Sequence, residues 1–211
     1  QKYKMMEKVG DGTYGDVFKG IEISTNEYVA IKALKSKIGS WKECLNLCEV
    51  KALSKLNNHS NIVKLKEVVR ENNSKVFLVF EFMEMNLYNL IEKLRRSKKL
   101  LPESTVKIIV DQITEGLVYI HSLNHIHRDL KPENILINYQ EGKENEIKVK
   151  IADFGLAREV ALNSLNLTPL TDYVCTRWYR APECVLKSNL YTQAVDIFAL
   201  GCVMTEVLTL K

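Results

Sequence analysis

Short apolar runs separated by turns dominate the first third of the chain. Residues 1–34 alternate between stretches rich in β-branched and aromatic residues and turns such as Thr25-Asn26. Residues 62–70 and 76–82 are two further runs of this kind, joined through the turn pair Asn72-Asn73. The pattern predicts β-strands, so we expect a mainly β part at the start of the chain.

Residues 40–56 predict a helix whose apolar face carries an acid. Ser40 and Glu43 form a capping box at its start. One stripe along it, at helical spacing, contains Leu45, Glu49, Leu53 and Leu56. A buried carboxylate without a cation is costly, and Lys32 is the obvious partner for Glu49. The alternative is that this acid lies at the rim of the stripe and reaches water.

The rest of the chain predicts mostly helix, with one strand pair. The expected helices are residues 86–94, 102–122 and 192–208. Residues 135–137 and 149–151 are apolar runs that we expect to pair, and the polar connector 138–148 is typical of a solvated insertion. Residues 156–176 have weak periodicity and many Ser, Thr and Asn, which indicates a mobile segment. Together these elements predict an α+β fold.

The composition limits the possible size and class of the protein but does not indicate a function. The chain has 211 residues, of which 46% are hydrophobic and 27% charged, an ordinary globular composition that suits one domain or two small lobes. The net charge of +4 does not indicate a dedicated nucleic-acid surface and is compatible with a polyphosphate ligand. Because no apolar run reaches about 18 residues, we expect no membrane span.

The cysteines indicate free thiols. There are five, an odd number, and none forms a Cys-x-x-Cys pair: they are Cys44, Cys48, Cys175, Cys184 and Cys202. This spacing argues against zinc, and unpaired thiols are typical of a reducing compartment. We therefore expect a cytoplasmic or nuclear protein.

One loop concentrates ionisable side chains between apolar segments. Residues 127–134 read His-Arg-Asp-Leu-Lys-Pro-Glu-Asn, and Pro132 and Asn134 make this stretch a loop rather than part of a helix. A charged surface loop is the simpler reading of any few of these residues. The full stretch, lying between elements expected to be buried, indicates a functional site on a scaffold.

A glycine pattern near the start of the chain indicates a ligand. Gly10, Gly12 and Gly15 have the G-x-G-x-x-G spacing, which dinucleotide-binding folds also use. A dinucleotide fingerprint opens a helix, whereas here residues 17–21 continue as a strand. The pattern therefore favours a hairpin folded over a ligand, in which glycines let the backbone approach phosphates.

Six motifs, in this order, resemble those of eukaryotic protein kinases. They are residues 10–17, 29–32 (Val-Ala-Ile-Lys), Glu49, 127–134, 153–155 (Asp-Phe-Gly) and 181–183 (Ala-Pro-Glu). The resemblance implies a bilobal fold, with an N-terminal lobe at residues 1–83 and an incomplete C-terminal lobe at 84–211. Residues 153–183 would then be the activation segment.

The resemblance also implies ATP and Mg²⁺ as cofactors and assigns the site. Asp129 would accept the proton of the attacking hydroxyl, Lys131 would steady the transferred phosphoryl group, and Lys32 would hold phosphates. Asn134 and Asp153 would bind magnesium. The residues expected at the nucleotide are Gly10, Asp11, Gly12, Thr13, Tyr14, Gly15, Val17, Ala30, Lys32, Glu49, Phe80, Glu81, Met83, Leu136 and Asp153. Phe80 would lie behind the adenine, and the backbone of residues 81–83 would bond its edge.

Further motifs narrow the group. Lys131 is typical of serine/threonine kinases, and residues 176–180 resemble the group of cyclin-dependent and mitogen-activated kinases. Thr171-Asp172-Tyr173 is a Thr-x-Tyr motif, and with residues 65–72 and 86–88 it is most similar to the male-germ-cell-associated (MAK-like, RCK) kinases. The resemblance implies proline-directed phosphorylation of protein substrates, activation at Thr171 and Tyr173 by an upstream kinase, and a link to cilia. It implies no nucleic-acid or membrane partner.

This chain departs from the kinase pattern in three ways. Cys48 stands where relatives often have an arginine that, with Arg128, holds a phosphorylated threonine. Residues 138–148 and 162–169 are longer than is usual. The chain ends at Lys211, just beyond the helix of Asp196, so we expect either a fragment or part of a longer molecule.

Other readings remain open at this point. A mitogen-activated or cyclin-dependent kinase is the alternative within the class. A nucleotide-binding scaffold without catalysis, that is a pseudokinase or an inactive truncated chain, is the alternative outside it. Scaffolds of that kind usually lose the phosphate-holding lysine, the base or the metal aspartate, and Lys32, Asp129 and Asp153 are all present.

Overall fold

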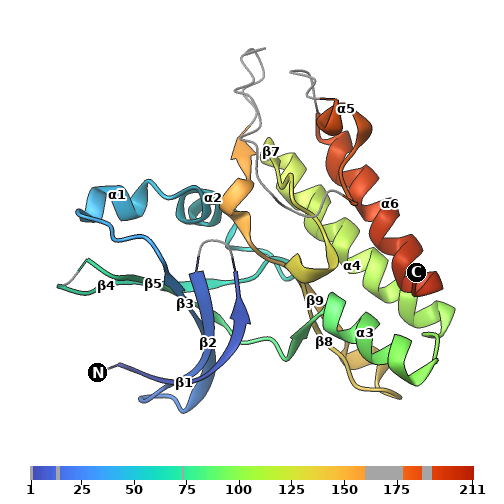
Figure 1. Ribbon diagram of the computed structural model, residues 1–211, viewed down its shortest axis with the longest axis horizontal. Coiled ribbons are helices and arrows are strands. Elements are labelled where there is room, and N and C mark those ends of the chain that lie inside the picture. The colour runs from blue at the N-terminus through green and yellow to red at the C-terminus, as the bar shows by residue number, and fades with distance from the viewer. Residues whose placement is uncertain (1, 13–14, 73, 160–177, 187–191) are drawn as a thin grey trace.

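The first part of the chain folds as a five-stranded antiparallel sheet (Figure 1). The computed structural model describes residues 2–12, 15–72, 74–159, 178–186 and 192–211. The strands are β1 (Tyr3–Asp11), β2 (Gly15–Glu22), β3 (Glu27–Leu34), β4 (Leu65–Arg70) and β5 (Val76–Glu81), in the sheet order β1-β2-β3-β5-β4. The strands predicted for this part of the chain are therefore present.

The single helix predicted at 40–56 is wrong, because the segment forms two helices. These are α1 (Trp41–Leu45) and α2 (Cys48–Leu56). The predicted cap is present, with the Glu43 amide donating to Ser40 Oγ at 3.2 Å. Leu47 lies between the helices with an extended ψ of 135°, which breaks the helical phase. As a result Leu45 is 55% exposed, whereas Glu49 is buried as predicted.

The strand predicted at 62–70 is shorter in the structure. Ile62 and Val63 lie outside β4 and attach instead to Ile151, which forms a parallel bridge with Ile62 and accepts a hydrogen bond from the Val63 amide at 2.9 Å. These two buried residues therefore tie the chain before β4 to the second half of the molecule.

The second part of the chain is mainly helical, with small sheets. Its helices are α3 (Leu87–Ser97), α4 (Glu103–Ser122), α5 (Pro182–Val185) and α6 (Ala194–Thr209), with 3₁₀ turns η1 (Pro132–Asn134), η2 (Glu144–Glu146) and η3 (Phe154–Leu156). Its strands are β6 (Met85–Asn86), β7 (His125–Ile126), β8 (Ile135–Asn138), β9 (Lys148–Ile151) and β10 (Arg158–Glu159), paired as β6-β8-β9 and β10-β7. The three predicted helices and the predicted pairing of β8 with β9 are confirmed, with ends shifted by a few residues.

The segment predicted to be mobile, residues 156–176, is described as far as Glu159. Its first residues complete η3 and form β10, which pairs with β7. Residues 160–177, which include Thr171, Tyr173, Cys175 and Arg177, lie outside the described residues, so the predictions made for them stay predictions.

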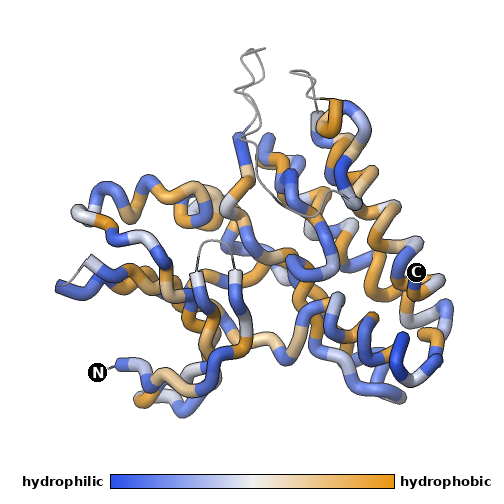
Figure 2. Tube along the Cα trace, viewed as in Figure 1, coloured by the Kyte–Doolittle hydropathy of each residue, from blue (hydrophilic) through white to orange (hydrophobic). Residues whose placement is uncertain are grey.

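One large apolar core joins most of the elements, with two smaller clusters beside it among the described residues. Figure 2 shows hydrophobic positions gathered along α4 and α6, which run side by side and are in contact. Phe154 is fully buried in this core, between α2 and the second half of the chain. Helix α6 is apolar on all sides, and Ile197 and Phe198 are exposed on its outer face. Within the described ranges, no helix has the length and apolar character needed to cross a membrane.

Two helical glycines provide a matched test of this packing. A Cβ at Gly201 of α6 would meet nothing within 4 Å, whereas a Cβ at Gly116 of α4 would lie 2.9 Å from Ile151 Cδ1 and 3.1 Å from Asn61 O. We expect Gly201→Ala to raise the free energy of unfolding by about 1 kcal/mol, because alanine favours helix. For Gly116→Ala, overpacking costs about 1–3 kcal/mol and cancels or reverses that gain. Urea unfolding of both variants measures the difference, and equal stabilisation would contradict the packing.

Candidate active site

A buried aspartate holds the charged loop of residues 127–134 in place. Asp196, in the first turn of α6, accepts hydrogen bonds from the backbone amides of His127 at 2.9 Å and Arg128 at 2.8 Å. The imidazole Nε2 of His121 lies 2.9 Å from the same carboxylate, which is only 1% exposed. Arg128 has a positive φ of 72°, a strained conformation that these bonds help to hold. The loop backbone is thus fixed by α6.

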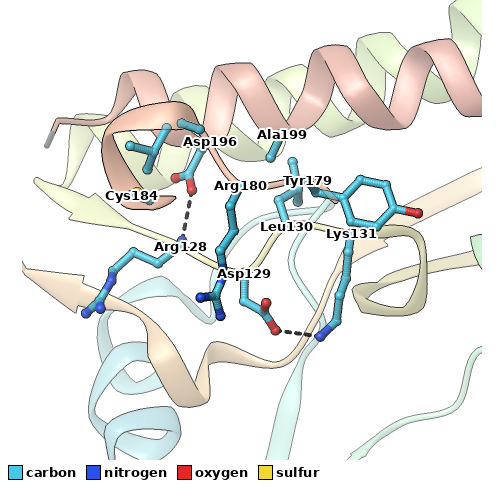
Figure 3. A pocket seen from close by; sticks show the side chains of 11 residues that line it. Arg128, Asp129, Leu130, Lys131, Tyr179, Arg180, Cys184, Asp196 and Ala199 are labelled. Atoms are coloured by element: carbon cyan, nitrogen blue, oxygen red, sulfur yellow. Dashed lines mark hydrogen bonds and ion pairs between the residues drawn. The ribbon is translucent and has the colours of Figure 1, made fainter. Parts of the chain in front are cut away.

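The loop brings three predicted catalytic residues together, as Figure 3 shows for two of them. Lys131 Nζ lies 2.8 Å from Asp129 Oδ2. The Asn134 amide Nδ2 donates to Asp129 O at 2.8 Å and to Asp129 Oδ2 at 3.0 Å. His127 orients the loop from within, since its Nε2 lies 3.0 Å from Ala152 O and its Nδ1 accepts from the Asp129 amide. The Asp129 carboxylate is therefore fixed in position by neighbouring side chains.

A second cluster joins the two halves of the molecule. Lys32 of β3 donates to Glu49 Oε2 of α2 at 2.7 Å and to Asp153 Oδ1, just after β9, at 3.2 Å. Burial disfavours a charged lysine, but the two carboxylates outweigh it and raise the pKa of Lys32. Burial raises the pKa of the Asp153 carboxyl, but the Lys32 ammonium outweighs burial and holds that pKa below its usual value. The predicted pairing of Lys32 with Glu49 is confirmed.

Asn134 and Asp153 provide oxygens suited to a hard cation. Asn134 uses its amide nitrogen on Asp129, so its side-chain oxygen is left as an acceptor. Asp153 has a left-handed backbone with φ of 61°, and its side chain remains 35% exposed although Lys32 contacts one of its oxygens. Magnesium takes carboxylate and amide oxygens as ligands. The donor set therefore fits the predicted metal.

The glycine hairpin between β1 and β2 has a structural need for one of its glycines. A Cβ at Gly15 would lie 2.5 Å from the backbone oxygen of Ala33, so no side chain fits there. Lys35 Nζ binds Asp11 Oδ1 at 3.1 Å and Gly12 O at 2.9 Å. Lys35 and then Lys8 lower the pKa of Asp11 to about 2. Thr13 and Tyr14 lie outside the described residues, whereas the strands that lead into and out of the tip are described.

Four of the residues predicted at the nucleotide, Val17, Ala30, Lys32 and Phe80, share one face of the sheet. The register places Val17 opposite Lys32 and Ala30 opposite Phe80, and directly opposed residues lie on the same face. Phe80 and Met83 are buried. Gly10 pairs with Val17 at the neighbouring strand, so the hairpin continues from this face.

An open pocket beside the loop contains residues that the motifs did not assign to the site. Asp129 and Lys131 line it together with Tyr179, Arg180, Cys184, Val195 and Ala199 (Figure 3). The hydroxyl of Tyr179 donates to Glu206 of α6. Burial, and to a smaller extent this hydrogen bond, raises the pKa of Tyr179. Tyr179 and Arg180 belong to residues 176–180, the stretch that resembles the group of cyclin-dependent and mitogen-activated kinases. Nothing in the sequence indicated that they line a pocket with Asp129.

Comparison with known proteins identifies the family. Residues 3–211 match the family described as protein kinase domain. The chain belongs to the protein kinase family. It is 51% identical over 210 residues to serine/threonine-protein kinase ICK of Mus musculus and 49% identical over 210 residues to serine/threonine-protein kinase MAK of Mus musculus. It is also 49% identical over 211 residues to cyclin-dependent kinase F-3 of Oryza sativa subsp. japonica.

These relatives bear out the predicted place of this kinase domain among MAK-like and cyclin-dependent kinases, and with it the bilobal α+β fold. Each alignment covers all of this chain. It covers 31% of ICK and of MAK and 45% of cyclin-dependent kinase F-3. The chain therefore spans less than half the length of the curated relatives it matches.

The support that Asp196 gives to the loop can be tested by removing one acceptor. Asp196→Asn puts an amide nitrogen against backbone N–H donors, so we expect a loss of about 2–4 kcal/mol in the free energy of unfolding. Asp111→Asn on the exposed face of α4 is the matched control and should change stability by less than about 0.5 kcal/mol. Thermal and urea unfolding compare the two, and equal midpoints would show that Asp196 does not hold the loop.

Proposed function

We propose that the protein containing this chain is a serine/threonine protein kinase that transfers the γ-phosphate of ATP to protein hydroxyls. The observation that carries the proposal is the buried Lys32, held at 2.7 Å from Glu49 and at 3.2 Å from Asp153. A buried cation between two carboxylates from distant parts of the chain supplies the positive charge that phosphates need. The names of the relatives, serine/threonine-protein kinases ICK and MAK, support the same activity.

Each residue has a distinct role in the proposed reaction. ATP with Mg²⁺, when bound, supplies the phosphoryl group and a cation that neutralises its charge. Lys32 binds the phosphates and is kept in place by Glu49. The oxygens of Asn134 and Asp153 hold the metal. Asp129 accepts the proton of the serine or threonine hydroxyl, since its carboxylate faces the pocket beside the loop.

Lys131 adds charge stabilisation next to the base. Its ammonium lies 2.8 Å from Asp129 Oδ2, within the same pocket. A cation at this distance can stabilise the negatively charged phosphoryl group as it approaches the hydroxyl oxygen. Positioning and electrostatics of this kind supply most of the catalysis in phosphoryl transfer.

Substrate preference and regulation are part of the proposal. By resemblance, the kinase is proline-directed and is switched on when an upstream kinase phosphorylates Thr171 and Tyr173. Each phosphate would add about −1.5 to −2 charges and order the segment through arginines. Cys48 is exposed at the start of α2, so the phosphothreonine contacts there are weaker than with an arginine. A cytoplasmic, nuclear or ciliary location is proposed on the same basis.

Replacing the proposed base tests the reaction. We expect Asp129→Asn to lower the rate of phosphate transfer by at least about 10²-fold, because general-base contributions are about 10²–10⁴-fold. ATP binding should stay within about twofold, since Asp129 is assigned to the hydroxyl and not to the nucleotide. Transfer of radiolabelled phosphate and ATP binding are measured on the same preparation, with Asp111→Asn as control. Full turnover by Asp129→Asn would reject the assignment, and transfer by neither protein would favour the scaffold alternative.

The ion pair of Lys32 and Glu49 predicts strong coupling. Lys32→Met and Glu49→Gln should each lower phosphate transfer, and the double variant should lose much less than the sum of the two losses. The reason is that either change already breaks the 2.7 Å contact. A double-mutant cycle on the transfer rate measures the coupling. Simple additivity would mean that Glu49 does not act through Lys32.

A further inference from the structure

The segment that connects the two halves of the molecule is held at two points by the β8–β9 hairpin. Residues 81–86 run from the end of β5 to the start of α3. Lys150 Nζ of β9 lies 2.9 Å from Glu81 Oε1. Three residues further on, the Glu84 amide donates to Asn138 Oδ1, at the end of β8, at 2.9 Å. The stretch between these contacts contains the backbone expected to bond the adenine.

Glu81 is fixed from the other side as well. Its amide donates to Lys64 O at 3.0 Å, and the Lys64 amide donates back to Glu81 Oε1 at 2.7 Å. Glu81 Oε1 thus accepts a hydrogen bond from the Lys64 amide and forms an ion pair with the Lys150 ammonium. Since Lys64 precedes β4 and Lys150 lies in β9, this oxygen couples the large sheet to the second half of the molecule.

The strand register places Lys150 beside Leu136, which is predicted to lie at the nucleotide. Lys150 is opposite Leu136 in the β8–β9 pair, so both side chains lie on the same face. Leu136 is opposite Asn86 in the β6–β8 pair. The side chains of Lys150 and Glu81 are only 14% and 29% exposed, so water screens their attraction less than on an open surface.

We propose that Lys150 is a positioning residue for the nucleotide base. It holds Glu81, and with it the backbone of residues 81–83, in the place that accepts adenine and rejects guanine. This inference rests on the proposed function, because it assumes that ATP binds here. The simpler reading is a partly buried ion pair that adds stability alone.

Base discrimination needs a backbone that cannot move. Adenine presents an amino donor where guanine presents a carbonyl acceptor. A site that hydrogen-bonds one pattern rejects the other only if its own groups cannot shift to suit it. The contacts of Lys150 and Asn138 restrain the segment at both ends, which is the restraint that discrimination requires.

The test compares two lysines of one strand. Lys150→Met should weaken ATP binding about three- to tenfold, the loss expected for a single ordinary hydrogen bond, and leave GTP binding nearly unchanged. The preference for ATP over GTP therefore shrinks. Lys148→Met is the matched control, because Lys148 lies on the same face of β9, is exposed, and has no ion pair with a described carboxylate. Calorimetric titration with each nucleotide in the presence of Mg²⁺ gives both dissociation constants.

Two further variants separate positioning from stability. Lys150→Arg keeps the cation and should restore the ATP preference. Glu81→Gln combined with Lys150→Met should bind ATP no more weakly than Lys150→Met alone, since both remove the same contact. Unchanged ATP binding by Lys150→Met, or an equal loss for ATP and GTP together with a lower melting temperature, would overturn the inference while leaving the proposed function intact. Absence of ATP binding by the unaltered chain would reject the proposed function and this inference with it.

Discussion

The buried ammonium of Lys32 is the interaction on which the active site depends. It donates to Glu49 of α2 and to Asp153, two residues beyond β9, which are far apart in the sequence and belong to different halves of the molecule. A charged lysine in this position would be costly without them, and either carboxylate would be costly without the lysine. The three groups therefore stabilise one relative placement of β3, α2 and the start of η3. That placement also seals Phe154 in the core and turns Asp153 toward the site.

The other half of the site is fixed by a different kind of contact. Asp196 meets backbone amides, not a lysine, so the loop of residues 127–134 is held at its main chain. Main-chain anchoring leaves the side chains of Asp129 and Asn134 to interact with each other. The loop thus has a rigid base on α6, whereas the Lys32 cluster depends on α2 keeping its place.

Much of the site followed from sequence because its chemistry is local. The loop of residues 127–134 carries its predicted base, its lysine and its asparagine within a few positions, and the glycine spacing was followed by a strand rather than a helix. The Lys32–Glu49 pair was predictable across a longer distance because an acid within an apolar stripe requires a cation. The Lys32–Glu49 pairing rests on an energetic requirement of the residue types, whereas the roles expected of the loop residues rest on their resemblance to protein kinase motifs.

Other features depend on geometry that residue types do not determine. The break at Leu47 exposes Leu45, although its spacing fits the apolar stripe, because one extended residue changes the direction of the following helix. Lys150 lies in a strand whose sequence indicates no special role. Its contact with Glu81 and its position opposite Leu136 are known only from the structure. Tyr179 likewise lines the pocket because the tertiary fold places it against α6, where it binds Glu206.

The break at Leu47 also bears on how α2 can move. Because α1 and α2 are separate helices, α2 starts at Cys48, and Glu49 lies in its first turn. A short helix joined through one extended residue can tilt without carrying α1 with it, so displacement of Glu49 from Lys32 needs little rearrangement of the segment before it. Its restraints are instead the apolar contacts of Leu53 and Leu56 and the packing of α2 against η3, where Phe154 is buried. The positions of Phe154 and Glu49 are therefore linked, because η3 packs against α2 and Lys32 contacts both Glu49 and Asp153.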